Sequence, residues 1–154
     1  MKLNYLIIPL ITLLVSLLGS WLTSGGMEWY QKIKLPAWTP AGSVIGFVWT
    51  TIFILSTISA LLVWNKFFHD KRFVWVIGLF FINAGLNIFW SWLFFNQHLI
   101  GWAAIEAALL GLSVVGLIIL IGPISRLATW LLVPYAAWVA FATYLTYLIW
   151  TLNR

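Results

Sequence analysis

The sequence contains no cysteine, and only three of its 154 residues are acidic. Without cysteine the chain has no disulfide, no thiolate metal site and no thiol nucleophile. Its two histidines, His69 and His98, lie near the ends of apolar runs and form no metal-ligand cluster. Charged residues amount to 7% of the chain, against about 25% in an average soluble domain. These shortages indicate an integral membrane protein.

Apolar residues take the place of the missing charge: 64% of the chain is hydrophobic, and the mean hydropathy is +1.05. The net charge is +5, and the charged residues cluster between the apolar runs. Basic residues in such positions suit a membrane surface, so the charge does not indicate a nucleic-acid partner. We therefore expect the chain to lie in a lipid bilayer and to bind no nucleic acid.

The apolar runs predict an all-α integral membrane protein built as a bundle of five transmembrane helices. A helix needs about 20 apolar residues to cross the hydrocarbon core. Five runs qualify within a single domain over residues 1–154, at about 4–23, 43–65, 73–95, 99–121 and 127–151. The first run has no clear cleavage site, so we interpret it as a retained span rather than a signal peptide. Short linkers make the later spans antiparallel neighbours.

One connection between spans is long, from Ser24 to Gly42. Its glycines and prolines argue against a regular helix, although it carries the apolar and aromatic residues Trp29, Tyr30, Leu35 and Trp38. We expect such a segment to fold back over the end of the bundle as a lid-like loop. The alternative is an interfacial anchor without a role in ligand access.

The basic residues predict the orientation in the membrane. One side carries Lys2, Lys66, Lys71, Arg72 and Arg126, and the other carries Lys32, Lys34 and Arg154. The side richer in Lys and Arg faces the cytoplasm in most membrane proteins. This places the N-terminus inside, and the short N-terminus without transit-peptide character suits a bacterial cell membrane.

Small residues and prolines predict local packing. Ala103, Ala107 and Gly111 are spaced by four and predict a close helix contact, and Gly42 and Gly46 repeat that spacing at the start of the second span. Two prolines inside spans, Pro9 and Pro134, are expected to kink or loosen their helices.

Twelve tryptophans occur in the chain, and several lie well inside the predicted spans rather than at their ends. Asn83, Asn87 and Trp90 share one face of the third span, and such a face should point at a cavity or another helix. Trp49 and Trp138 are expected to approach each other across the interior, with Ala142 leaving space beside Trp138. Indole surfaces away from lipid can line a pocket for a flat aromatic ligand, although packing or interfacial anchoring explains any single Trp.

Glu106 is the only acidic residue inside a predicted span. A carboxyl group at membrane depth needs a partner or a water-lined cavity. It is either a proton or cation carrier, or a structural group that is protonated or hydrogen-bonded inside the bundle. No Lys, Arg or His within the spans is an obvious partner.

An ordered set of motifs resembles one known family. The motifs are Trp29-Tyr30, the loop Leu35-Pro-Ala-Trp-Thr-Pro40, Gly46-x-x-Trp49, Leu86-Asn-x-x-Trp90-x-x-x-Phe94-Phe95, Gly101-Trp102 with Glu106, and Leu132-Val-Pro-Tyr-Ala-Ala-Trp138-Val-Ala-Phe-Ala142. They resemble the translocator protein and tryptophan-rich sensory protein (TspO) family, the peripheral benzodiazepine receptor family. The resemblance covers nearly the whole chain.

The resemblance implies a five-helix bundle, often a homodimer, with a ligand cavity below the first long loop. It implies binding of porphyrins and, in many members, of benzodiazepine-type drugs and sterols. The family's pocket positions carry over to Tyr30, Trp38, Pro40, Trp49, Phe53, Asn83, Asn87, Trp90, Trp138 and Ala142. Some bacterial relatives are associated with light-dependent breakdown of protoporphyrin, which implicates Trp49 and Trp138 here.

The chain departs from the family pattern in two places. The loop has Pro40-Ala41 where the family often has two prolines. The cholesterol motif of animal members allows one to five residues between a tyrosine and the following basic residue, and Tyr147 and Arg154, with six residues between them, miss this spacing narrowly. We therefore do not expect cholesterol to be the native ligand.

The residues and the resemblance together leave three hypotheses, and a purely structural or interaction protein is the residual alternative if no flat ligand binds. The first is a membrane receptor or sensor that binds tetrapyrroles such as protoporphyrin IX or haem, needs no resident cofactor or metal, and also accepts flat drug-like ligands. The second is an enzyme that degrades porphyrin in light through Trp49 and Trp138. The third is a porphyrin transporter or a small proton-coupled transporter using Glu106, although the odd number of spans and the single acid argue against it.

Overall fold

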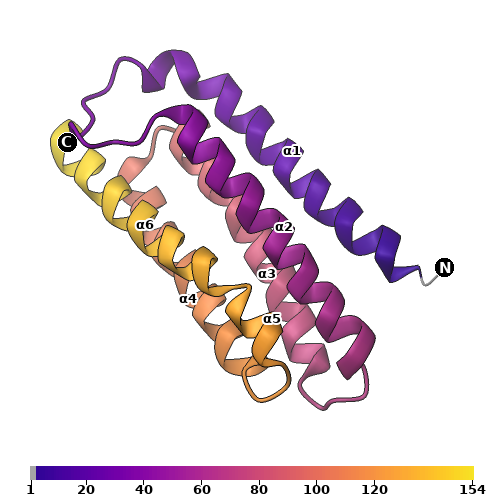
Figure 1. Cartoon of the computed structure of the whole chain (residues 1–154). Coiled ribbons are helices and arrows are strands. Elements are labelled where there is room, and N and C mark those ends of the chain that lie inside the picture. Colours follow the sequence, from indigo (N-terminus) through magenta and orange to yellow (C-terminus); the bar gives the residue numbers. More distant parts are fainter. Residues whose placement is uncertain (1–2) are drawn as a thin grey trace.

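The computed structural model describes residues 3–154, and this part of the chain contains helices and no strand (Figure 1). The elements are α1 (Asn4–Tyr30), α2 (Gly42–Phe67), α3 (Phe73–Ser91), the π-helix η1 (Trp92–Asn96), α4 (Ile100–Ile121), α5 (Arg126–Trp130) and α6 (Val133–Asn153). Counting α3 with η1 and α5 with α6, five segments are long and apolar enough to cross a membrane. The predicted fold class is confirmed.

The five spans pack as a closed ring. α1 lies against α2, α2 against α5 and α6, α6 against α4, α4 against α3, and α3 against α1. The connection 31–41 and the C-terminus lie together at one end of the bundle, which we call the loop end (Figure 1). Residue 3 and the turns at 68–72 and 122–125 lie at the opposite end, which we call the N-terminal end.

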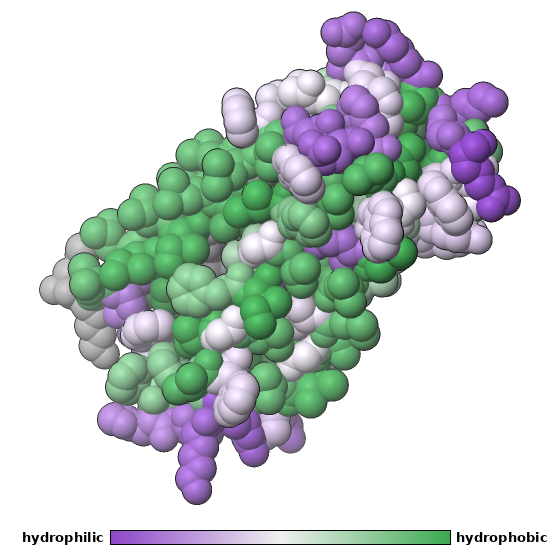
Figure 2. All heavy atoms as spheres, turned by 180° about the vertical axis from the view of Figure 1, so that it is seen from behind, coloured by the Kyte–Doolittle hydropathy of each residue, from purple (hydrophilic) through white to green (hydrophobic). Residues whose placement is uncertain are grey.

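The surface of the bundle is that of a membrane protein. Hydrophilic residues gather at the two ends, and a broad apolar band lies between them (Figure 2). Large side chains such as Trp21, Trp75 and Trp102 are mostly exposed on the outer faces of different helices. In water this surface would be strongly unfavourable, whereas lipid tails solvate it. The protein is therefore a multi-pass integral membrane protein, and its orientation stays a prediction.

Helix α4 carries the densest core. Its residues at spacings of three and four, including Ala103, Ala107, Leu110, Val114 and Leu117, are almost fully buried. Ala103 and Ala107 let α6 approach closely, and a Cβ at Gly111 would lie 3.4 Å from Val139 Cγ1. The predicted small-residue contact of this span is confirmed. The same prediction for Gly42 and Gly46 is wrong, because a Cβ there would meet nothing within 4 Å.

The first span is longer than its sequence suggests. α1 continues through Gly25 and Gly26 to Tyr30, so the connection to α2 covers only residues 31–41. The glycines serve helix packing instead of a turn: a Cβ at Gly26 would lie 2.3 Å from the carbonyl oxygen of Phe95. The loop boundaries expected at 24–42 are therefore corrected, and Tyr30 belongs to a helix.

The two prolines inside predicted spans behave differently. The last span is interrupted before Pro134, which lies in the first turn of α6, where its missing N–H leaves no hydrogen bond unmade. α1 is continuous through Pro9. The expected loosening is therefore confirmed by a break at Pro134, while Pro9 interrupts nothing.

Candidate functional site

A hydrogen-bonded cluster joins three helices near the middle of the bundle. The Asn83 amide donates to Ser113 Oγ at 2.8 Å, and the Tyr135 hydroxyl donates to Asn83 Oδ1 at 3.0 Å. The Asn87 amide donates to the Tyr135 oxygen at 3.2 Å. All four residues are buried. The predicted inward face of Asn83 and Asn87 is confirmed, and the cluster satisfies polar groups that lipid would leave unpaired.

This cluster forms one end of a cavity of about 370 Å³ between α1, α2 and α3. Of the predicted site residues, Phe53, Asn83 and Asn87 line it. The remaining lining residues come from the N-terminal half of the bundle: Leu3, Asn4, Ile7, Ile8, Ile11, Thr12, Val15, Ser56, Ala60, Trp64, Ile77, Phe80, Phe81, Ala84 and Tyr135. Sequence reasoning missed Tyr135, although its position one residue after Pro134 inside a family motif was a usable signal.

The two tryptophans expected to face each other have separate neighbours. The Trp49 ring lies 5.7 Å from the ring of Phe53 and 6.0 Å from that of Tyr135, which places it beside the cavity wall. The Trp138 ring lies 5.2 Å from that of Phe141, toward the loop end. Both pack against the same buried core cluster, but the ring contacts of each are with other aromatic residues, in tilted or edge-on geometry, and not with its counterpart.

Besides Ser56, three side chains inside the bundle have buried polar atoms without a hydrogen-bond partner in the described protein. They are the indole Nε1 atoms of Trp90 and Trp138 and both carboxyl oxygens of Glu106. Trp90 stacks on Phe94 with ring centroids 5.1 Å apart, so its ring is fixed while its N–H is unpaired. Unpaired buried donors and acceptors are costly, and in native proteins each of them calls for an explanation.

Glu106 itself is 4% exposed and has no basic partner in the part of the chain that the structure describes. The single ion pair found there joins Lys32 to Glu28 on the surface. The sequence-based alternative of a carboxyl group hydrogen-bonded inside the bundle is not realised among the described residues. A carrier role for Glu106 gains no support from its surroundings.

The connection 31–41 folds back onto α6, as expected. Trp38 stacks on Tyr144 with nearly parallel rings and also contacts Phe141. The Lys34 backbone exchanges two hydrogen bonds with the Asn153 side chain, which holds the loop to the end of α6. Tyr30 packs on Phe94 and Phe95, while Pro40 and Ala142 are half-buried. These loop-end residues do not line the cavity.

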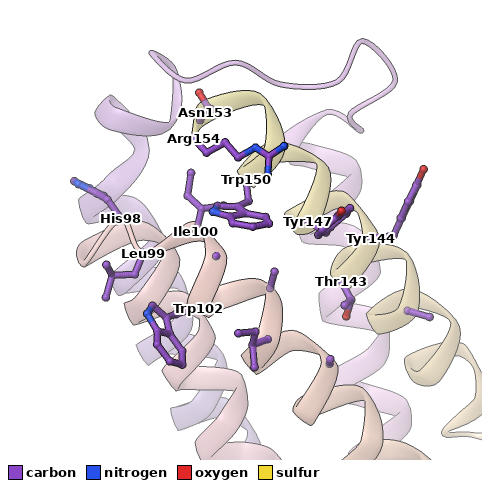
Figure 3. Close-up of a pocket in the computed structure, with 15 residues that line it drawn as sticks. His98, Leu99, Ile100, Trp102, Thr143, Tyr144, Tyr147, Trp150, Asn153 and Arg154 are labelled. Carbon is purple, nitrogen blue, oxygen red and sulfur yellow. The ribbon is translucent and has the colours of Figure 1, made fainter.

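A second hollow is an open groove of about 970 Å³ on the outer face of α4 and α6, which the sequence did not indicate (Figure 3). Trp102, Tyr144, Tyr147 and Trp150 line it over a floor of small residues, and the Arg154 guanidinium lies 5.4 Å from the centre of the Trp150 ring. Tyr147 and Arg154, the residues of the imperfect cholesterol motif, both lie here. The groove is separate from the interior cavity.

Comparison with known proteins places these features in a family. Residues 7–151 match the model of the TspO/MBR family. The tryptophan-rich protein TspO of Bacillus cereus is 33% identical over 81% of this chain and 80% of its own length. The human translocator protein is 34% identical over 84% of this chain and 77% of its own length. TspO of Archaeoglobus fulgidus is 33% identical over 94% of this chain and 93% of its own length. The chain is therefore a membrane protein of the TspO/MBR family of translocator and tryptophan-rich sensory proteins.

Proposed function

We propose that this protein is a membrane receptor or sensor for porphyrins, and for other flat aromatic ligands, which bind inside the bundle. The observation that carries the proposal is the combination of a cavity ending at Asn83 and Asn87 with unpaired indole donors at Trp90 and Trp138. Binding pockets for small molecules are mostly apolar with a few convergent polar groups, and typical volumes are about 300–1,000 Å³. The cavity meets that description.

A porphyrin macrocycle needs the space to extend toward the loop end. There the aromatic rings of Trp49 and Trp138 offer flat surfaces, and the unpaired Trp90 and Trp138 N–H groups offer donors. Hydrogen bonds to a ligand would relieve the cost of these buried donors.

The loop 31–41 would act as the lid over this site. The loop is held to α6 by the stack of Trp38 on Tyr144 and by the two Lys34–Asn153 hydrogen bonds. Because these contacts are few, the loop can open to admit a ligand. The porphyrin carboxylates would then lie at the loop end, where Lys34 and Arg154 are exposed. The ring itself would remain among uncharged side chains.

We expect protoporphyrin IX to quench the tryptophan emission of the detergent-solubilised protein saturably in the dark. Trp138→Phe keeps an aromatic ring but removes the N–H, so we expect about five- to tenfold weaker binding. Trp130→Phe, at a residue that is 69% exposed on the outside of the bundle, is the matched control and should bind like the wild type. Equal affinities of all three proteins would contradict the proposed site.

Illumination of the same samples distinguishes a receptor from an enzyme. Light that removes the porphyrin absorbance in the wild type, but not in Trp49→Phe or Trp138→Phe, would identify an enzyme of porphyrin breakdown. Stable absorbance would leave a receptor or sensor. Haem should be titrated in parallel, because the uncharged walls do not distinguish it from the metal-free ring.

A further inference from the structure

The open groove on the outer face of α4 and α6 has a positively charged end and an apolar end. At the loop end Asn153 and Arg154 line it, and the Lys34 backbone is hydrogen-bonded to the Asn153 side chain (Figure 3). Toward the middle of the bundle its floor includes Ala108 and Ala140. No Asp or Glu lines the groove in the part of the chain that the structure describes. A molecule that matches both ends has a negative head and an apolar tail.

Packing between the two helices sets the position of the positive charge. The Arg154 guanidinium lies 5.4 Å from the centre of the Trp150 ring, in cation–π range. That ring lies against Gly101 of α4, where a Cβ would be only 2.9 Å from the indole nitrogen. The acidic side chain at the loop end, Glu28, is paired with Lys32. The charge of Arg154 is therefore held at the mouth of the groove and forms no ion pair with a described side chain.

The length of the groove corresponds to one leaflet of a bilayer. Ala140 lies 13 residues before Asn153, the last residue of α6, which is about 20 Å at 1.5 Å per residue. Half of a bilayer, with its headgroup region, is about 20 Å thick. A lipid of the leaflet at the loop end would thus have its headgroup beside Arg154 and its acyl chains beside the alanines.

The walls of the groove suit such a lipid. Trp102 and Tyr147 are 65% and 48% exposed, and both line it. Tryptophan and tyrosine are typical of the interface between headgroups and acyl chains. A sterol would leave Arg154 without a partner because it carries no charge, and a zwitterionic headgroup would bring a second positive charge to the same place. An anionic headgroup has neither disadvantage.

We infer that this groove holds one anionic phospholipid from the leaflet at the loop end. Its phosphate pairs with Arg154 and lies near Lys34, and an acyl chain runs between α4 and α6 over Ala108 and Ala140. The site lies outside the interior cavity and does not depend on the proposed porphyrin function.

Native mass spectrometry of the full chain tests this inference, with phosphatidylglycerol or phosphatidylcholine added to the detergent. We expect one retained phosphatidylglycerol per chain, bound about five- to tenfold more tightly than phosphatidylcholine. Arg154→Gln should weaken phosphatidylglycerol binding about fivefold, the effect of one basic residue near a membrane surface, and should leave phosphatidylcholine unchanged. Porphyrin is left out, because its carboxylates are expected near the same cations.

Matched variants separate this site from general attraction to anionic lipid. Arg72→Gln removes an exposed cation at the N-terminal end and should bind phosphatidylglycerol like the wild type. Ala140→Phe fills the groove and should abolish retention, whereas Ala137→Phe on the same helix is exposed outside the groove and should not. Ala108→Phe fills the groove from α4 and replaces Ala140→Phe if that variant fails to fold.

Three results would overturn the inference. They are equal retention of the two phospholipids, full retention by a folded variant with a filled groove, and displacement of phosphatidylglycerol by equimolar cholesterol or inorganic phosphate. Cholesterol lacks the charge and inorganic phosphate lacks the chains, so neither should compete with a lipid that uses both ends of the groove.

The cysteine-free chain allows the position of the lipid to be tested. Thr143 lines the groove, while Thr51 is exposed on α2 outside it, and each hydroxyl bonds to a carbonyl of its own helix. Phosphatidylglycerol should slow the reaction of Thr143→Cys with N-ethylmaleimide at least fivefold relative to phosphatidylcholine. The control Thr51→Cys should react at the same rate in both lipids. Equal slowing of the two cysteines would contradict a lipid bound in this groove.

Discussion

Replacing Gly26 by alanine should destabilise this protein by about 1–3 kcal/mol, the usual cost of overpacking a close contact. The added Cβ would lie 2.3 Å from the Phe95 carbonyl oxygen and 2.6 Å from Phe95 Cβ. These are atoms of the backbone and of its first side-chain carbon, so no rotamer change can make room. α1 and η1 must separate, and the contacts of Tyr30 with Phe94 and Phe95 would be lost with them.

The measurement is thermal unfolding in detergent, followed by circular dichroism. Gly85→Ala is the matched control, because it lies within a helix and its Cβ would meet nothing within 4 Å. Ala is the better helix former, so this control should retain or slightly raise the stability. Gly101→Ala should fall between the two, since its Cβ would meet the movable indole of Trp150 at 2.9 Å. Equal stability of Gly26→Ala and Gly85→Ala would show that the α1–η1 contact is not tight.

The length of α1 shows where sequence reasoning fails in a membrane. Gly25-Gly26 is typical of a turn in water, where glycine loses conformational entropy in a helix. Inside a bilayer a helix keeps its hydrogen bonds because no alternative partner exists, and glycine then serves close packing. The sequence does not reveal that the partner of Gly26 is the Phe95 backbone, because that contact depends on how two distant helices cross.

The five spans were predictable because hydropathy and length alone specify them. The inward face of Asn83 and Asn87 was predictable for a similar reason, since two amides one turn apart cannot face lipid. The position of the cavity was not. It depends on the gap between α1 and α3, and no pattern within a single helix records a gap between two helices. Ser56 was missed for this reason, since an isolated serine in a span has no distinctive spacing.

The second large effect concerns the Asn83–Tyr135 hydrogen bond, whose partners should prove coupled in a double-mutant cycle. Asn83→Leu leaves the Tyr135 hydroxyl without its acceptor and Ser113 without a donor. Tyr135→Phe leaves Asn83 Oδ1 and the Asn87 amide without their partner. Each single change creates unpaired buried groups and should cost about 1–3 kcal/mol. The double variant removes both members of the Asn83–Tyr135 bond, so its cost should be less than additive.

The expected coupling is about 0.5–1.5 kcal/mol, the lower part of the range for residues in contact, because polar groups in a membrane find other partners when the fold opens. Thr146→Val combined with Asn83→Leu is the control pair, since the Thr146 hydroxyl bonds only to the Ala142 carbonyl of its own helix. That pair should be additive. If the Asn83 and Tyr135 changes were additive as well, the polar cluster would not act as a unit. The inner end of the cavity would then be held by the apolar packing of α3, α4 and α6, and Asn83 and Asn87 would be free to turn toward a ligand.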